Sequence, residues 1–86
     1  MKPLLFEAYP GLEAVPWVSL GNFPTPIQRL TKLGEAKGFK NLYVKRDDKS
    51  SPIYGGNKVR KLEWVLADAK EKGRKTLITV GGSGSN

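Results

Sequence analysis

The chain of 86 residues has 15 Lys and Arg against 8 Asp and Glu, a net charge of +7, and neither cysteine nor histidine. This length and composition predict one small globular domain or part of one. The missing residue types exclude disulfides, Cys- or His-ligated metal sites, and a histidine base or Ser-His-Asp triad within these residues. We therefore expect no metal site.

Residues 1–26 carry five of the six prolines, and we expect an irregular N-terminal arm there. The first apolar run is short, Glu7 interrupts it, and no small-residue cleavage site follows, so it is not typical of a signal peptide. No apolar run approaches the ~20 residues that a membrane span needs. These features predict a cytoplasmic protein that has no membrane partner.

Residues 27–86 are expected to form an α/β unit. The three-residue spacing of apolar side chains predicts a short helix over 27–37 that ends around Gly38. Alternating polarity predicts a strand over 41–47. A loop with a proline and a double glycine follows over 47–56.

The clearest helix signal covers 57–72, with Gly73 as the residue just past its C-terminus. The β-branched run over 76–80 predicts a buried strand, and GGSGSN follows it. This order of elements predicts a parallel sheet with flanking helices. A complete domain seldom ends inside such a glycine loop, so we interpret 27–86 as an incomplete α/β domain truncated after the Gly/Ser loop.

Lys58 is the first basic residue of this helix. At about 100° per residue, the apolar side chains Leu62, Val65, Leu66 and Ala69 fall within about 80° of it. We therefore expect Lys58 to begin the buried face. A helix N-terminus and desolvation both favour the neutral, nucleophilic amine. The alternative is a lysine whose aliphatic carbons cover the end of this apolar face while its amine reaches water.

Two further features accompany this helix. Trp64 and Ala67 form a second, weaker apolar patch, which we expect to pack against a loop or a partner. The terminal Gly/Ser run offers free backbone N–H groups that suit an anion if a helix follows it. Runs of this composition are also common in linkers.

Four motifs occur in order along the chain: PTPIQRL, LYVKRDD, YGGNKVRKLE and GGSGSN. As a set they resemble the N-terminal part of the fold-type II, tryptophan synthase β-like pyridoxal-phosphate enzymes. The closest pattern is the 1-aminocyclopropane-1-carboxylate deaminase and D-cysteine desulfhydrase group. The resemblance covers about residues 22–86. It implies pyridoxal 5'-phosphate as cofactor and a lyase or deaminase activity on a small amino acid.

The resemblance also implies roles for single residues. Lys58 would form the internal aldimine and move the substrate proton, and Asn57 would help to place it. Asn86 would hydrogen-bond the cofactor's ring hydroxyl. Ser83, Gly84 and Ser85 would hold the substrate carboxylate, and Ser85 would also act in catalysis.

The chain departs from this group where Ser83 and Gly84 stand, because the group usually has two bulkier residues there. The sequence therefore leaves the substrate open. The family's phosphate-binding loop would lie far downstream, so we expect the 86 residues to be inactive alone. The resemblance implies that the full-length parent is a homodimer.

Two other interpretations are open. The positive charge could indicate a nucleic-acid-binding module. Acidic residues interrupt the basic ones, as where Asp47 and Asp48 follow Lys45 and Arg46, and this favours ordinary solvated surfaces and no nucleic-acid partner. The chain could also be a small basic α/β binding module without catalysis.

Overall fold

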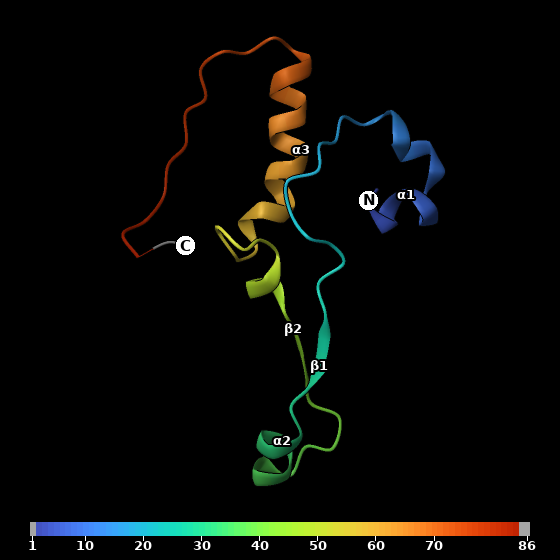
Figure 1. Ribbon diagram of the computed structural model, residues 1–86, viewed down its shortest axis with the longest axis vertical. Coiled ribbons are helices and arrows are strands. Elements are labelled where there is room, and N and C mark those ends of the chain that lie inside the picture. The colour runs from blue at the N-terminus through green and yellow to red at the C-terminus, as the bar shows by residue number, and fades with distance from the viewer. Residues whose placement is uncertain (1, 85–86) are drawn as a thin grey trace.

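The computed structural model describes residues 2–84. The elements in chain order are α1 (Leu4–Ala8), the 3₁₀ helix η1 (Pro10–Ala14), β1 (Ile27–Arg29), α2 (Thr31–Lys37), β2 (Tyr43–Lys45), the 3₁₀ helix η2 (Asp47–Lys49) and α3 (Lys58–Glu71). Figure 1 shows the arm and α3 at one end of the molecule, and the two strands with α2 extending away from them. Residues 46–57 join β2 to α3.

The sheet is antiparallel and has two strands, with Ile27 opposite Lys45 and Arg29 opposite Tyr43. The parallel sheet predicted from the order of elements is not present among residues 2–84. The short helix α2 only reverses the chain between β1 and β2, and a reversal of this kind produces antiparallel neighbours.

The helix predicted over 27–37 begins later than expected. Residues Ile27–Arg29 form β1, and α2 occupies Thr31–Lys37. Pro26 favours extended backbone here, and its carbonyl accepts a hydrogen bond from the Arg46 N–H at 2.8 Å. Cross-strand pairing therefore prevails over the helical spacing of the first residues. The predicted end at Gly38 is confirmed.

The helix predicted over 57–72 is confirmed as α3, and its end follows the predicted chemistry. Gly73 has a φ of 66°, which favours glycine. Its N–H bonds the Lys70 carbonyl, and the Arg74 N–H bonds the Ala69 carbonyl. These two bonds are the Schellman pattern that satisfies the last carbonyls of a helix.

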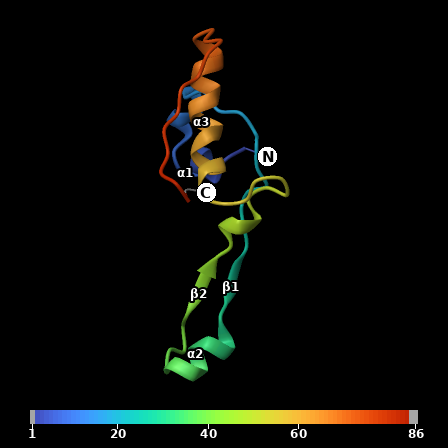
Figure 2. The same ribbon diagram turned by 90° about the vertical axis from the view of Figure 1, so that its left-hand side faces the viewer.

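The strand predicted over 76–80 does not form in residues 2–84. The segment after Gly73 turns back and runs along α3 toward its first turn, as both views show (Figures 1 and 2). Its apolar side chains are open to solvent, with Ile78 91% and Val80 94% exposed. A strand exists only through its hydrogen-bonded neighbour, and the described residues provide none for this segment.

The N-terminal arm contains α1 and η1 in place of the irregular backbone expected there. It packs on one face of α3. The Phe6 ring meets Trp17 and Trp64 edge to face, with ring centroids 6.3 and 5.6 Å apart. The Trp64 patch, which we expect to pack against a loop or a partner, packs against the Phe6 ring of helix α1 in the same chain.

A buried carboxylate attaches the arm to α3. Glu63 is 4% exposed, and its oxygens accept hydrogen bonds from Trp17 Nε1 at 3.2 Å and from the Leu20 and Gly21 N–H groups at 2.8 and 3.1 Å. Its backbone carbonyl accepts a further bond from the Val18 N–H at 3.0 Å. Hydrogen bonds to a charged group are stronger than neutral ones, so Glu63 is the main polar attachment of the arm.

Candidate functional site

Lys58 is the first residue of α3, and its side chain is half-buried. Among residues 2–84 its amine makes no hydrogen bond and no ion pair. Asn57 precedes it at the N-cap position, in helical backbone conformation, and its side chain makes no capping hydrogen bond. The first turn of α3 therefore carries an unpaired lysine amine, and the neighbouring Asn57 side chain does not cap the helix.

The buried face of α3 differs from the predicted one. The buried residues are Val59, Glu63 and Ala67, which lie about 100° to 180° around the axis from Lys58. The arm covers that side because its N–H groups converge on Glu63. On the predicted Lys58-centred face, Val65 is 54% exposed. The expectation that Lys58 begins the buried face is thus wrong for residues 2–84.

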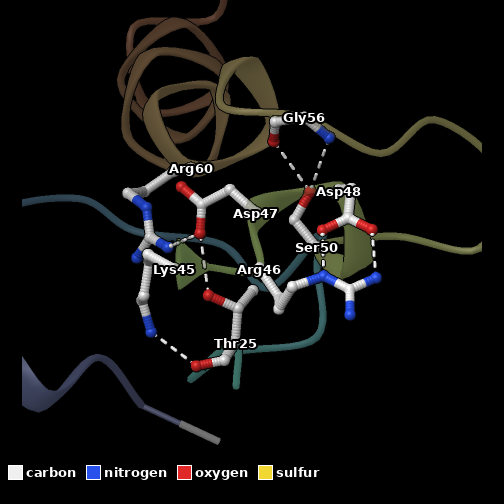
Figure 3. A network of polar contacts seen from close by, with 8 residues as sticks. All are labelled: Thr25, Lys45, Arg46, Asp47, Asp48, Ser50, Gly56 and Arg60. Atoms are coloured by element: carbon white, nitrogen blue, oxygen red, sulfur yellow. Dashed lines mark hydrogen bonds and ion pairs between the residues drawn. The ribbon is translucent and has the colours of Figure 1, made fainter. Parts of the chain in front are cut away.

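The loop over 47–56 leads into Lys58 and is closed by Ser50. Ser50 is 0% exposed, and its hydroxyl donates to the Gly56 carbonyl at 2.8 Å and accepts from the Gly56 N–H at 3.1 Å (Figure 3). Gly56 has a φ of 132°, a conformation that favours glycine. At Gly55 a Cβ would lie 2.1 Å from the Asp48 carbonyl oxygen. The double glycine is therefore required by the path of this loop.

Asp47 connects three parts of the site. One of its carboxylate oxygens accepts hydrogen bonds from Thr25 Oγ1 at 2.7 Å and from the Arg60 guanidinium at 2.6 Å (Figure 3). The bond from Arg60, and then that from Thr25, lower the pKa of Asp47 below its ordinary value. Arg60 also lies over the Phe23 ring, 4.5 Å from its centroid. This network joins the start of β1, the end of β2 and the first turn of α3.

A second pair lies beside it on the surface. Arg46 donates to both carboxylate oxygens of Asp48, at 2.9 and 2.7 Å, and to Gln28 Oε1 at 2.6 Å. The bidentate hydrogen bond from Arg46 lowers the pKa of Asp48, and the same bond raises that of Arg46. Asp47 and Asp48 thus each form an ion pair with an arginine of the same chain. This agrees with the charge pattern, in which acidic residues interrupt the basic ones.

The Gly/Ser loop is only partly described. Ser83 and Gly84 are exposed in the segment that runs back along α3, and that segment ends near the level of the helix's first turn (Figures 1 and 2). Among the described residues, no hydrogen bond joins Ser83 or Gly84 to Lys58. Ser85 and Asn86 lie outside the described residues. The structure therefore places Asn57 beside Lys58, and it leaves Ser83 and Gly84 without a hydrogen bond to the lysine amine.

Other possible sites in the described part of the chain are few. A hollow of about 580 Å³ lies between the arm and α3, with Trp17, Phe23, Arg60 and Trp64 in its lining. Its lining includes none of the predicted site residues, so it does not mark the site. Residues 2–84 hold no cluster of three metal-ligating side chains. Within the same range, no helix combines the length and apolar character needed to cross a membrane.

Asp47, Ser50 and Arg60 were missed as site residues by sequence reasoning. The charge pattern assigned Asp47 to the balance of acidic and basic residues on the surface. Their signal was weak: a loop rich in Asp and Ser that ends on two glycines, with Asn57 between them and the lysine. Neither the burial of Ser50 nor the length of the bonds to Asp47 can be obtained from spacing alone.

The chain matches the model of one protein family, described as "Pyridoxal-phosphate dependent enzyme", over residues 18–86. It is also similar to curated proteins. It is 48% identical over 78 residues to the 1-aminocyclopropane-1-carboxylate deaminase of Burkholderia lata, an alignment that covers 88% of this chain. It is 45% identical over 83 residues, or 94% of the chain, to the protein of that name from Methylobacterium sp..

A third relative carries a different name. The D-cysteine desulfhydrase of Salmonella paratyphi A is 44% identical over 75 residues, which is 87% of this chain. The chain spans 22% or 23% of the length of these three relatives.

Proposed function

Because the chain belongs to the family of pyridoxal-phosphate dependent enzymes, we propose that Lys58 is the residue that binds pyridoxal 5'-phosphate covalently. The observation that carries this proposal is the unpaired Lys58 amine in the first turn of α3. A lysine bound in an ion pair would be held in its charged form, whereas an unpaired amine is available for attack on an aldehyde.

The surroundings of Lys58 fit this cofactor. The positive end of the helix dipole lies at the first turn of α3, where it opposes an added cation and favours an anionic group. When bound, the cofactor supplies the electron sink of the reaction, and the protein supplies its orientation.

We propose that the whole protein is a lyase or deaminase acting on a small amino acid. The names of the relatives from Burkholderia lata and Salmonella paratyphi A support this class. Lys58 takes or returns a substrate proton, and Asn57 helps to place the lysine. Because the relatives carry two different activity names, the proposal covers both 1-aminocyclopropane-1-carboxylate deamination and D-cysteine desulfhydration.

The Gly/Ser loop completes the proposed site. Ser83, Gly84 and Ser85 hold the substrate carboxylate through backbone N–H groups and hydroxyls, and Ser85 takes part in the chemistry. Asn86 hydrogen-bonds the ring hydroxyl of the cofactor. The path of the segment after Gly73, which returns to the level of the first turn of α3, supports this assignment (Figure 1).

The remaining parts of the proposal concern the whole protein. We propose a parallel sheet with flanking helices in the complete α/β domain, in which 27–86 are the first part and 1–26 are an arm. We also propose a cytoplasmic homodimer without nucleic-acid or membrane partners. The 86 residues alone are proposed to be inactive, because they span less than a quarter of the relatives' length.

Borohydride trapping tests the assignment of Lys58. The full-length gene product is loaded with pyridoxal phosphate, reduced, digested and mapped by mass spectrometry. We expect the label on Lys58, its loss in K58A and its retention in K61A, a matched control that removes an exposed lysine of the same helix. A label on any other lysine contradicts the proposal.

A further inference from the structure

The loop 47–56 holds the chain on both sides of Lys58. Gly56, two residues before the lysine, bonds Ser50 and the Asp47 backbone. Arg60, two residues after it, bonds the Asp47 carboxylate. Among residues 2–84, the Lys58 amine makes no hydrogen bond or ion pair. The loop therefore fixes the segment that carries the lysine without engaging the amine.

Ser50 is the first of the two residues that hold this segment. A fully buried hydroxyl that both donates to and accepts from one residue leaves Gly56 a single position. The Gly56 N–H is shared, since it also donates to the Asp47 carbonyl at 2.9 Å. The Ser50 carbonyl in turn accepts from the Asn22 N–H at 2.7 Å. Ser50 thus connects the entry of α3 to the arm as well as to its own loop.

Asp47 is the second support and acts on the other side of the lysine. The Arg60 guanidinium and the Thr25 hydroxyl meet on the same carboxylate oxygen (Figure 3). Lys45 donates to the Thr25 carbonyl and completes the connection to β2. The first turn of α3 is therefore tied to the two-stranded sheet and cannot rotate freely about its own axis.

The direction of this support matters for the lysine. Arg60 lies two residues beyond Lys58, about 200° around the helix, so the Asp47 contact is on the opposite face. The arm covers Val59 and Glu63, which are also away from Lys58. These contacts therefore hold the first turn on the side away from Lys58 and leave the side that carries the lysine open.

We propose that Asp47 and Ser50 are positioning residues for Lys58, holding the first turn of α3 so that the amine projects from one fixed place. This inference rests on the proposed function of Lys58, which it extends to the loop before the lysine. Neither residue contacts the reacting atoms in this proposal. Both act through the backbone of Gly56 and the side chain of Arg60.

The test uses the full-length gene product with Ser50→Ala and, separately, Asp47→Asn. S50A removes the hydroxyl without adding bulk, and D47N keeps the shape of a partly exposed side chain, so it serves if S50A does not fold. Asp68→Asn is the matched control, because it breaks the ion pair between Asp68 and Lys72 at the far end of the same helix. Thermal melting confirms that each variant is folded.

Two readouts separate positioning from general stability. In the protein without cofactor, we expect hydrogen exchange at 56–60 to be about tenfold faster in S50A and D47N, as the loss of a buried hydrogen bond predicts. In the loaded protein, we expect kcat to fall about tenfold with KM changed less than about twofold, because a misplaced group affects the chemical step more than binding. We also expect the pH midpoint of the bound cofactor's visible absorption to shift. D68N should leave all three unchanged.

The outcomes distinguish this inference from the function on which it rests. If S50A and D47N match D68N in exchange, kcat and absorption midpoint while Lys58 carries the borohydride label, the positioning role is overturned and the function stands. If exchange at 56–60 accelerates while Lys58 carries no label, the loop holds the first turn as proposed and the function fails.

Discussion

The N-terminal arm and the segment after Gly73 both contain large apolar side chains, yet their packing differs. In the arm, Phe6 is 6% exposed, whereas Ile78 and Val80 in the second segment are more than 90% exposed. The arm contacts α3 through an aromatic cluster and the Glu63 carboxylate. Residues 74–84 are exposed throughout.

The contrast shows that a segment packs here when other parts of the chain offer it hydrogen-bonding and apolar groups. Its own residue types matter less. The arm has polar groups that Glu63 satisfies, so it can lie on α3 as irregular chain with short helices. The 76–80 segment has strand-forming residues, but a strand needs a neighbour for its backbone groups. Among residues 2–84 that neighbour is lacking, and a favourable composition does not replace it.

The radius of gyration and the accessible surface of the chain agree with the view that some apolar segments lack a packing partner. Its radius of gyration is 16.6 Å, against about 12 Å for a compact domain of this length. Its accessible surface is 7108 Å², against roughly 5,000 Å² for a compact protein of this mass. The excess surface includes the 76–80 segment and the face of α3 around Lys58 that was predicted to be buried.

The largest expected effect is on the arm. Glu63→Ala leaves the Leu20 and Gly21 N–H groups without their acceptor, which costs about 2 kcal/mol or more. We expect amide protection at Leu20 and Gly21 to fall roughly thirtyfold, as measured by hydrogen exchange with NMR detection. Glu71→Ala is the control, since Glu71 is exposed on the same helix. Equal protection in both variants would mean that Glu63 does not hold the arm.

A smaller effect is expected from acid. The hydrogen bond from Arg60 lowers the folded-state pKa of Asp47 below its ordinary 3.8. Its stabilisation is therefore fully present above that ordinary value and is lost as the pH falls through the lowered folded-state pKa. Because the pair is partly exposed, we expect only about 0.5 kcal/mol.

The measurement is urea unfolding followed by circular dichroism at pH 6 and below pH 3. Asp47→Asn should remove this part of the acid dependence, and Glu71→Gln should retain it. An unchanged pH dependence in D47N would show that the Asp47–Arg60 pair does not contribute to stability.

The smallest expected effect is in the segment after Gly73. In the 86-residue chain, Ile78→Ser should change the free energy of unfolding by less than about 0.5 kcal/mol, as for other exposed positions. The same urea titration measures it. A loss of about 2 kcal/mol or more would indicate a buried side chain and would remove the contrast between the two regions.

Much of the local structure was predictable from the sequence. The helix over 57–72 and its end at Gly73 follow from apolar spacing and from the conformational freedom of glycine. The strand around Tyr43–Lys45 follows from alternating polarity. These features depend on neighbours within a few residues along the chain, so the sequence alone contains their cause.

The errors concern contacts between distant segments. The strand β1 replaced the start of a helix because its partner lies 14 to 18 residues away in the register with β2. The buried face of α3 was misassigned because Glu63 receives N–H groups from Trp17, Leu20 and Gly21, which no helical spacing reveals. Long-range pairing prevailed over local periodicity in both cases.

The candidate site divides in the same way. The sequence by itself determined that an unusual lysine begins the main helix after two glycines, because helix signals and chemistry at a helix start are local properties. Only the tertiary structure decided which face of that helix is covered and how the lysine's segment is held. Ser50, Asp47 and Arg60 act across 6 to 13 residues, and such contacts form only when the folded backbone brings their polar groups within hydrogen-bonding distance.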